Sequence, residues 1–462
     1  MHLSQSTLSH QQKRIRHHAV NSDSYTFFNQ LTGPDFLEQV ESLLPEHRER
    51  LFPPTETLSM FLAQAMNEDS SCQKAVNDAA IIRLRGGLPL CSTNTGSYCQ
   101  ARQRLPLEMI KSLACYTGVT MAANTPGIWH WRGRPVRLVD GATVSMPDTE
   151  ENQSIYPQPS SQKPGLGFPI CRLVGIICLG SGALLNTAIG PCRGKGGDEQ
   201  SLLRSLLDTL NPGDIIMGDA FYATYFLLCA LQEKGVDAVF EQHGSRKRST
   251  DFRLGKRLGK QDHLITLEKP KCRPDWMSQE AYDQAPDRLL VRELHTGGKT
   301  LVTTLLDSKT VSKADLKAFY QGRWNVEVDL RHIKTTLGME ILSCRTPEMV
   351  EKEIWVYLLA YNLIRVMMAQ AALLSDILPR QLSFKHALQL WVTWLAASRE
   401  GYDDHQLTEV FFLMAQQKAG KRPGRIEPRA VKRRPKPFPL LTKIRGVARE
   451  DVKKNGHPKK MK

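Results

Sequence analysis

Residues 136–140, Val-Arg-Leu-Val-Asp, begin a series of short apolar segments that decides the fold. The segments 171–178 and 183–189 continue the series, and their β-branched and apolar residues are typical of buried strands. Three neighbouring strands followed by alternating helices and strands predict an α/β fold in which helices cover a mixed sheet. The later elements are helices predicted at 201–210 and 222–234 and strands predicted at 214–219 and 236–240.

Two aspartates each end one of these predicted strands. Asp140 follows the apolar run VRLV, and Asp219 follows IIMG and precedes Ala-Phe-Tyr. A carboxylate at the carboxyl end of a buried strand lies at the mouth of the sheet, where α/β proteins bind ligands and metals. The alternative is an ordinary turn or helix-capping aspartate.

A third segment, residues 312–337 (SKADLKAFYQGRWNVEVDLRHIKTTL), is predicted to be one long helix that starts at Ser312 as its cap. At about 100° per residue, Tyr320, Arg323, Glu327 and Lys334 fall on one narrow face, while Asp329 points the other way. A carboxylate among a phenol and two cations suits a metal ligand bordered by groups that bind phosphate. A solvated face with ordinary ion pairs is the alternative.

The spacing Tyr320-x2-Arg323-x3-Glu327-x6-Lys334 matches the YREK signature, so the sequence resembles the bacterial insertion-sequence DDE transposases of the type-four insertion-sequence family. Asp140 in VDGATVSMPDT and Asp219 in GDAFY resemble that family's first and second catalytic-aspartate motifs, in the order Asp, Asp, Glu. The resemblance covers residues 136–359. It implies an RNase H-like mixed five-stranded sheet flanked by helices, with a β-rich insertion that includes predicted strands at 289–294 and 301–306.

The expected domain organisation combines this resemblance with the changes of pattern along the chain. A helical N-terminal DNA-binding domain comes first, and the two parts of the core flank the insertion. A helical region and a basic tail follow. The expected bounds are 1–125 for the N-terminal domain, 126–240 and 309–375 for the core, 241–308 for the insertion, 376–417 for the helical region and 418–462 for the tail.

The resemblance also implies the chemistry. Asp140, Asp219 and Glu327 would bind two Mg²⁺ ions, for which Mn²⁺ could substitute, and would support in-line phosphodiester displacement. Tyr320, Arg323 and Lys334 would bind phosphates of the transposon ends. Cut-and-paste transposition through a DNA hairpin, with two protomers pairing two terminal inverted repeats before transfer into target DNA, is the implied pathway. A nuclease that does not join strands and a catalytically silent DNA-binding protein are the alternatives.

Three further groups of residues are candidates for DNA contacts. Residues 244–260 are strongly basic and would lie beside DNA, unless they form a solvated loop. Family members stack a flipped base on a Trp of the insertion, so Trp276 could do this or could simply pack. The segment 91–106 resembles a turn before a DNA-reading helix, or a capped helix with surface arginines. The candidates are Arg246, Lys247, Arg248, Lys256, Arg257, Trp276, Arg102 and Arg104.

The charge of the chain is concentrated at its end. Among 462 residues there are 62 Lys and Arg against 47 Asp and Glu, a net charge of +15. Residues 418–462 contain 17 of the basic residues and 3 of the acidic ones, together with six prolines. We therefore expect an extended, partly disordered polycation that binds nucleic acid in a salt-dependent way. A solubilising or ribosome-binding tail is the alternative.

Other features limit the class of protein. The apolar window 354–374 contains Asn362, Arg365 and Gln370, so a core helix is predicted rather than a membrane span. The N-terminus has no signal-peptide pattern, and we expect a cytoplasmic, nucleoid-associated protein. Ten cysteines without C-x-x-C spacing argue against a zinc site or a disulfide scaffold.

Overall fold

The computed structural model describes residues 38, 40, 42–44, 51–194, 196–247, 250–397, 404–419 and 443–456. Within these residues, one mixed sheet runs through the molecule in the strand order β3-β2-β1-β4-β5-β9-β8-β7-β6. β1 pairs in parallel with β4, and β4 with β5, whereas the other pairs are antiparallel. The strands are β1 (Val136–Ser145), β2 (Ile170–Cys178), β3 (Leu184–Pro191), β4 (Ile215–Gly218), β5 (Asp237–Glu241), β6 (Lys256–Gly259), β7 (Asp262–Glu268), β8 (Arg288–Thr296) and β9 (Lys299–Thr303).

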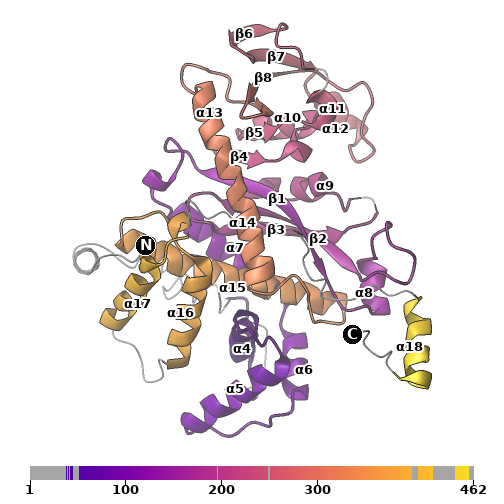
Figure 1. The fold of residues 1–462 in the computed structure, drawn as a ribbon, viewed down its shortest axis with the longest axis vertical. Helices are drawn as coiled ribbons and strands as arrows, with labels where there is room; N and C mark the ends of the chain where they lie inside the picture. Colours follow the sequence, from indigo (N-terminus) through magenta and orange to yellow (C-terminus); the bar gives the residue numbers. More distant parts are fainter. Residues whose placement is uncertain are drawn as a thin grey trace, which may run out of the picture.

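The first five strands correspond to the five segments predicted as strands of the core, and their order is consistent with an RNase H-like core. The prediction of a five-stranded sheet is nevertheless wrong, because the insertion continues the sheet. Val239 of β5 pairs with Thr303 of β9 in antiparallel register. Without β9, the backbone groups along that side of β5 would form an open sheet edge. The insertion strands β6 to β9 therefore extend the core sheet at one end of the molecule (Figure 1).

The predicted helix 312–337 begins where expected. The Ser312 hydroxyl accepts a hydrogen bond from the Asp315 amide, and the Asp315 carboxylate accepts one from the Ser312 amide, which is a capping box. The helical path is not uniform, because a 3₁₀ turn and a π-helical segment interrupt it. In order, it consists of α13 (Lys313–Tyr320), η4 (Gln321–Arg323), α14 (Trp324–Arg331) and the π segment η5 (His332–Thr336). In Figure 1 this path runs in front of the central strands.

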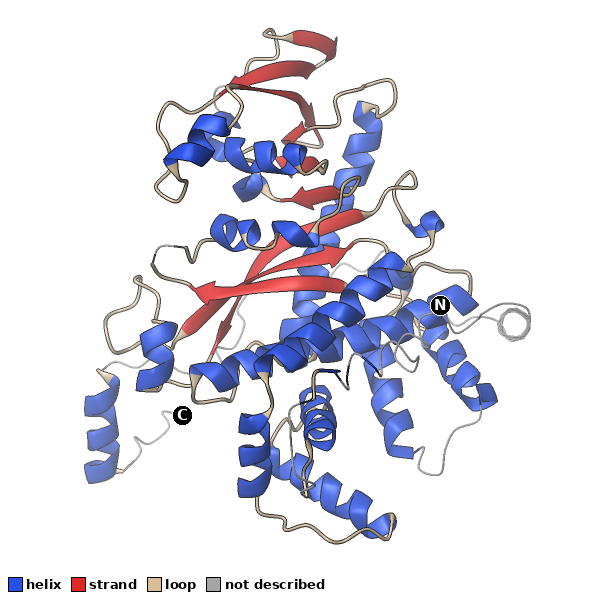
Figure 2. Cartoon of the chain, turned by 180° about the vertical axis from the view of Figure 1, so that it is seen from behind, coloured by secondary structure: helices blue, strands red, loops and turns tan. Residues whose placement is uncertain are grey.

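Helices also lie on the opposite face of the central strands, which Figure 2 shows from behind. There α7 (Leu107–Ala123) packs on β3, and α15 (Pro347–Leu374) packs on α7. The side-chain amide of Asn362 joins all three elements, since it donates to the carbonyls of Ala114 and Leu184 and accepts from the Leu184 amide. A Cβ atom on Gly118 would come within 1.8 Å of the Leu184 carbonyl oxygen, so glycine permits this close packing.

α15 is a core helix, as predicted for residues 354–374. Its length and composition alone would suit a membrane span, but 89% of its most apolar 18-residue window is buried inside the protein. Its polar residues have partners there: Asn362 bonds to α7 and β3, and Arg365 pairs with Asp329 of α14. Burial of paired polar groups on this helix explains why a long apolar helix contains them.

The N-terminal helices α4 (Pro54–Met66), α5 (Cys72–Arg85) and α6 (Gly96–Arg104) lie at the end of the molecule opposite the insertion (Figure 1). The apolar residues of α4 recur at helical spacing, and Leu58, Phe61 and Ala65 are buried. Residues 86–95 separate α5 from α6. This connection is longer than the three to four residues of a helix-turn-helix, so the expected resemblance to that DNA-reading motif is not supported here.

The C-terminal region contains α16 (Phe384–Ala397), α17 (Asp404–Gln416) and α18 (Arg445–Asn455). α18 is a helix within the tail predicted to be extended, and it forms between Pro439 and Pro458, where no proline interrupts it. The rest of the tail beyond residue 419 lies outside the described residues. Shorter helices complete the described chain: η1 (Gly127–Trp129), α8 (Glu150–Ile155), α9 (Glu199–Arg204), η2 (Leu207–Thr209), η3 (Ala220–Tyr222), α10 (Tyr225–Glu233), α11 (Gly244–Lys247), α12 (Gln279–Gln284) and η6 (Pro379–Gln381).

Candidate active site

Asp140 and Asp219 lie at the same level on adjacent parallel strands. Leu138 of β1 is in register with Met217 of β4, and each aspartate comes two residues later. The Asp140 carboxylate accepts a hydrogen bond from the Gly141 amide at 2.8 Å. Asp219 is the N-cap of η3, and its carboxylate accepts one from the Phe221 amide at 2.8 Å. Asp219 therefore does act as a helix cap, as its alternative interpretation expected, while it also lies beside Asp140 in the sheet.

Arg323 connects the first predicted catalytic residue to the third. Its guanidinium group donates to Glu327 Oε1 at 2.5 Å, and a second nitrogen lies 3.9 Å from Asp140 Oδ2. Glu327 is on α14 and Asp140 is on β1, and these two elements pack together. Glu327 and Asp140 thus face one another across a single arginine, although 187 residues separate them in the sequence.

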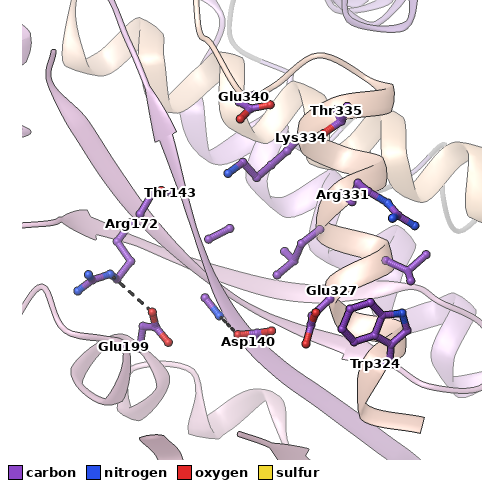
Figure 3. Close-up of a pocket in the computed structure, with 14 residues that line it drawn as sticks. Asp140, Thr143, Arg172, Glu199, Trp324, Glu327, Arg331, Lys334, Thr335 and Glu340 are labelled. Atoms are coloured by element: carbon purple, nitrogen blue, oxygen red, sulfur yellow. Dashed lines mark hydrogen bonds and ion pairs between the residues drawn. The ribbon is translucent and has the colours of Figure 1, made fainter. Parts of the chain in front are cut away.

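Both carboxylates line a cavity of about 500 Å³ beside residues 140–143 of β1 (Figure 3). The prediction that Asp140 ends its strand is wrong, because β1 continues to Ser145 through antiparallel pairing with β2. Lys334, whose side chain is half-buried, lines the same cavity from η5. Asp219 is not among its lining residues. The charged residues of its lining are Asp140, Glu199, Glu327 and Glu340 on the acidic side and Arg172, Arg331 and Lys334 on the basic side.

Burial and like charge make Asp140 hard to ionise. Burial is the main cause that raises the pKa of Asp140 to about 6, and the carboxylates of Asp219 and Glu199 raise it further. The Gly141 amide and the Arg323 guanidinium oppose this shift. The pKa of Glu199 is also raised, again mainly by burial. A group of carboxylates that is partly desolvated and insufficiently neutralised favours an additional cation.

The kinds of ligand present suit a hard divalent cation, since carboxylate oxygens are typical ligands of Mg²⁺ and Mn²⁺. In the described part of the chain, no three His, Cys, Asp or Glu side chains lie close enough together to bind one ion. Instead, the Arg323 guanidinium pairs with Glu327 and Asp140. A metal could bind if these side chains turned from Arg323 toward a common point.

The remaining YREK residue, Tyr320, is buried, and its hydroxyl donates to the Gly218 carbonyl at 3.0 Å. Burial raises the pKa of this phenol well above its usual range. The Tyr320 hydroxyl could donate to a phosphate only after it leaves the Gly218 carbonyl. The hydroxyl attaches α13 to the end of β4, immediately before Asp219.

Asp329 faces away from the site, as predicted. It is fully buried, and its carboxylate accepts hydrogen bonds from Arg365 and from Arg380, the latter at 2.6 and 2.5 Å. Two opposite faces of α14 thus contain carboxylates in different environments.

The candidate DNA contacts of the N-terminal region divide into one buried and one exposed residue. Arg102 is 8% exposed, and its guanidinium lies over the rings of Phe61 and Tyr98. The expectation that Arg102 lies against DNA is wrong for this structure, because helices α4 and α6 enclose the side chain between them. Arg104 is exposed and keeps its place as a candidate.

The candidates in the insertion also differ from one another. Arg246 pairs with the buried Glu293 at 2.8 Å, whereas Lys256 and Arg257 are exposed on β6. The side chain of Lys247 and all of Arg248 lie outside what the structure describes. Trp276 is 49% exposed, but the Arg204 guanidinium covers one face of its ring at 3.8 Å from the centroid. A base could stack on that face only after Arg204 moves.

The cavity residues that sequence patterns did not identify include Glu199, Arg172 and Trp324. Trp324 is 59% exposed. Its position directly after Arg323 in the predicted helix could have identified it as a candidate site residue. Glu199 comes after Asp198, whose side chain caps α9, so the pair has the appearance of an ordinary helix start. Only the tertiary structure brings Glu199 to the cavity.

Comparisons with known proteins agree with this arrangement. Residues 131–363, about half of the chain, match the transposase DDE domain family. Over 409 residues the chain is 28% identical to transposase InsG for insertion sequence element IS4 of Escherichia coli K12, with 86% of this chain and 89% of that protein covered. It is also 31% identical over 137 residues to the putative transposase InsZ of the same organism, with 29% of this chain and 45% of that protein covered. These matches confirm the resemblance inferred from the YREK signature, and the chain belongs to the DDE transposase family.

Proposed function

We propose that this transposase cleaves DNA at the ends of a transposable element and joins the freed ends to target DNA. The cut-and-paste pathway would proceed through a DNA hairpin on an RNase H-like core. Asp140, Asp219 and Glu327 are the proposed catalytic residues. The observation that carries the proposal is the meeting of Asp140 and Glu327 at one cavity, with Asp219 at the same level on the adjacent strand.

The three carboxylates would bind two Mg²⁺ ions, or Mn²⁺ in their place, and their oxygen ligands support this choice. When bound, such ions lower the pKa of an attacking water or 3′-hydroxyl and stabilise the leaving oxygen. Arg323 would exchange part of its pairing with Asp140 and Glu327 for a phosphate of the bound DNA. Lys334, from the same side of the cavity, would bind a neighbouring phosphate.

The substrates in this proposal are double-stranded DNA, first the terminal inverted repeats and then the target. Exposed cations far from the cavity, Lys256 and Arg257 on the insertion and Arg104 on α6, support a long binding surface. Two protomers would pair two ends. DNA as the substrate favours a cytoplasmic location at the nucleoid.

The test uses the full-length protein and a duplex that contains an inverted repeat identified in the DNA flanking the coding region. With Mg²⁺ we expect cleavage, a hairpin that migrates as a double-length strand on a denaturing gel, and joined products with target plasmid. Asp140→Asn and Glu327→Gln should lose all three products and still bind the duplex. Cleavage without joined products would support the nuclease alternative. Binding without cleavage by the wild-type protein would support the silent DNA-binding alternative.

A further inference from the structure

Glu199 brings a fourth carboxylate to the candidate active site. It is the first residue of α9, which packs on β2 and β3. Its carboxyl group lies against Gly141, directly after Asp140. A Cβ atom on residue 141 would come within 2.4 Å of Glu199 Cδ and 2.5 Å of Oε1. The absence of a side chain at 141 therefore creates the space that the Glu199 carboxylate occupies.

Two neighbours orient this carboxylate. The hydroxyl of Tyr222, a fully buried residue of η3, donates to Glu199 Oε2 at 3.2 Å. Because Asp219 caps η3, this bond connects Glu199 to the segment that follows the second proposed catalytic aspartate. Arg172 Nε lies 3.8 Å from Oε1, a distance that permits electrostatic attraction but is too long for a hydrogen bond.

The Arg172 side chain shows that this pairing is incomplete. One of its terminal nitrogens donates to the Gly197 carbonyl at 2.8 Å. Its Nε is buried and has no hydrogen-bond partner within the part of the chain that the structure describes. A buried donor without a partner is unusual in a folded protein. The Glu199 carboxylate therefore lies near Arg172 without a hydrogen bond to its Nε. It lines the same cavity as Asp140 and Glu327 (Figure 3).

We propose that Glu199 is a further metal-binding residue, which binds a divalent cation together with Asp140. This inference rests on the proposed function. The carboxylates of Asp140 and Glu199 each lie beside the Gly141 backbone and line one cavity, and their like charges repel one another. A shared divalent cation would turn that repulsion into attraction. In this proposal Tyr222 is a positioning residue, since its hydroxyl orients Glu199 and does not reach the ion.

The experiment measures binding of Mn²⁺ to the full-length protein from the electron paramagnetic resonance signal of the free ion, which disappears on binding. Glu199→Gln retains the shape of the side chain and a hydrogen-bond acceptor for Tyr222, so we expect the protein to fold and to bind Mn²⁺ at least about tenfold more weakly. Tyr222→Phe should weaken binding by a smaller factor, and Glu199→Asp should retain more affinity than Glu199→Gln. Glu340→Gln is the matched control. It removes an exposed carboxylate at the far side of the same cavity (Figure 3), and Mn²⁺ affinity should not change.

A second measurement separates metal binding from a structural role. If Glu199 only anchors α9 to Tyr222 and Arg172, Glu199→Gln will lower Tm in EDTA and leave the rise in Tm on adding Mn²⁺ unchanged, which would overturn the proposal. If Glu199 binds the metal, Tm in EDTA will stay the same or rise, because a repulsion is removed, and the Mn²⁺-dependent rise will shrink.

The variants Asp140→Asn and Glu327→Gln distinguish the two levels of inference. If they also bind Mn²⁺ like the wild type, the metal site proposed for the transposase itself is wrong. If they lose Mn²⁺ while Glu199→Gln keeps it, only the role of Glu199 is wrong. Hydroxyl-radical cleavage of the chain by bound Fe²⁺ gives an independent readout, and the expected result is cleavage near residues 140 and 199 in the wild type that weakens in Glu199→Gln.

Discussion

Glu327 and Asp329 are two residues apart on α14, and the protein treats their charges in opposite ways. Asp329 is fully buried and receives hydrogen bonds from Arg365 and Arg380, so its charge is neutralised inside the fold. Glu327 faces a cavity that it shares with Asp140 and Glu199, and Arg323 pairs with it there. A carboxylate whose charge is fully neutralised by arginines of the protein, such as Asp329, has a structural role. Carboxylates that lie together with too few basic side chains, as at the cavity of Glu327, favour the binding of a cation from solution.

Glu327→Gln should produce the largest effect, and it tests the functional face of α14. We expect cleavage of end DNA to fall by at least about 10³-fold, because the amide cannot replace an anionic ligand of a divalent ion. Tm in EDTA should stay close to that of the wild type. Single-turnover cleavage measures the rate, and thermal unfolding measures Tm. If Glu327→Gln remained active, the two faces of α14 would not differ in function as proposed.

Asp329→Asn tests the structural face. It leaves the buried Arg365 and the partly buried Arg380 without their carboxylate, and breaking a buried ion pair in this way costs about 3–5 kcal/mol of unfolding free energy. We expect a clear fall in stability in urea, whereas the Mn²⁺ affinity of the folded protein is retained. A stable Asp329→Asn protein with weakened Mn²⁺ binding would mean that the roles of the two residues are reversed.

Gly141→Ala sharpens the comparison without removing any charge. The new methyl group would displace the Glu199 carboxylate, which is the end of a flexible side chain, so the expected loss of stability is small. Affinity for Mn²⁺ should fall by about tenfold, as for loss of a neighbour that orients a ligand. Titration with Mn²⁺ and urea unfolding check both statements. A large loss of stability without a loss of affinity would contradict this account of Gly141.

The smallest expected effect is the pH dependence of the metal-free protein. The pKa of Asp140 is raised to about 6 in the folded chain, above the value of about 3.9 in an unfolded one. The folded state therefore favours the protonated form, and stability falls as pH rises from about 4 to about 6 and stays lower above it. In EDTA at pH 7.5, Asp140→Asn should raise Tm by at least about 2 °C, and the difference from wild type should vanish at pH 4. If Asp140→Asn and the wild type had the same Tm at pH 7.5 as well as at pH 4, burial would not disfavour the charge of Asp140.

The core strands were predictable because each is a short run of apolar residues that the fold buries, from 136–140 to 236–240. In the extension, the strands predicted at 289–294 and 301–306 correspond to β8 and β9, but β6, β7 and the joining of all four strands to the core sheet were not predicted. β6 is only four residues long and basic, and β7 mixes polar and apolar residues, so neither has the composition of a buried strand. The interruption of the 312–337 helix by a π segment also lacks a pattern in the sequence, since Ser312 and its neighbours specify where the helix starts and not how it winds.

At the site, the end of the strand before Asp219 was predictable because strand ends are local properties, whereas β1 continues past Asp140 to Ser145. Contacts between distant segments were beyond this reasoning. The burial of Arg102 depends on Phe61, 41 residues earlier, and the position of Glu199 depends on the missing side chain of Gly141, 58 residues earlier. The local sequence around Arg102 or Glu199 would look the same if the residue lay at an exposed surface, so the pattern alone could not place either side chain.

Strand pairing continues from β4 to β6, so the sheet fixes the spacing between Asp219 and the insertion. Five strand-to-strand steps separate Asp219 at the end of β4 from the exposed cations of β6, which at about 4.8 Å per step amounts to about 24 Å. Along B-form DNA with a rise of about 3.4 Å, that distance corresponds to about seven base pairs. If a duplex bound both at Asp219 and at the cations of β6, the number of strands between them would set the distance from the β6 contact to the cut. That distance would not depend on the base sequence between the two contacts.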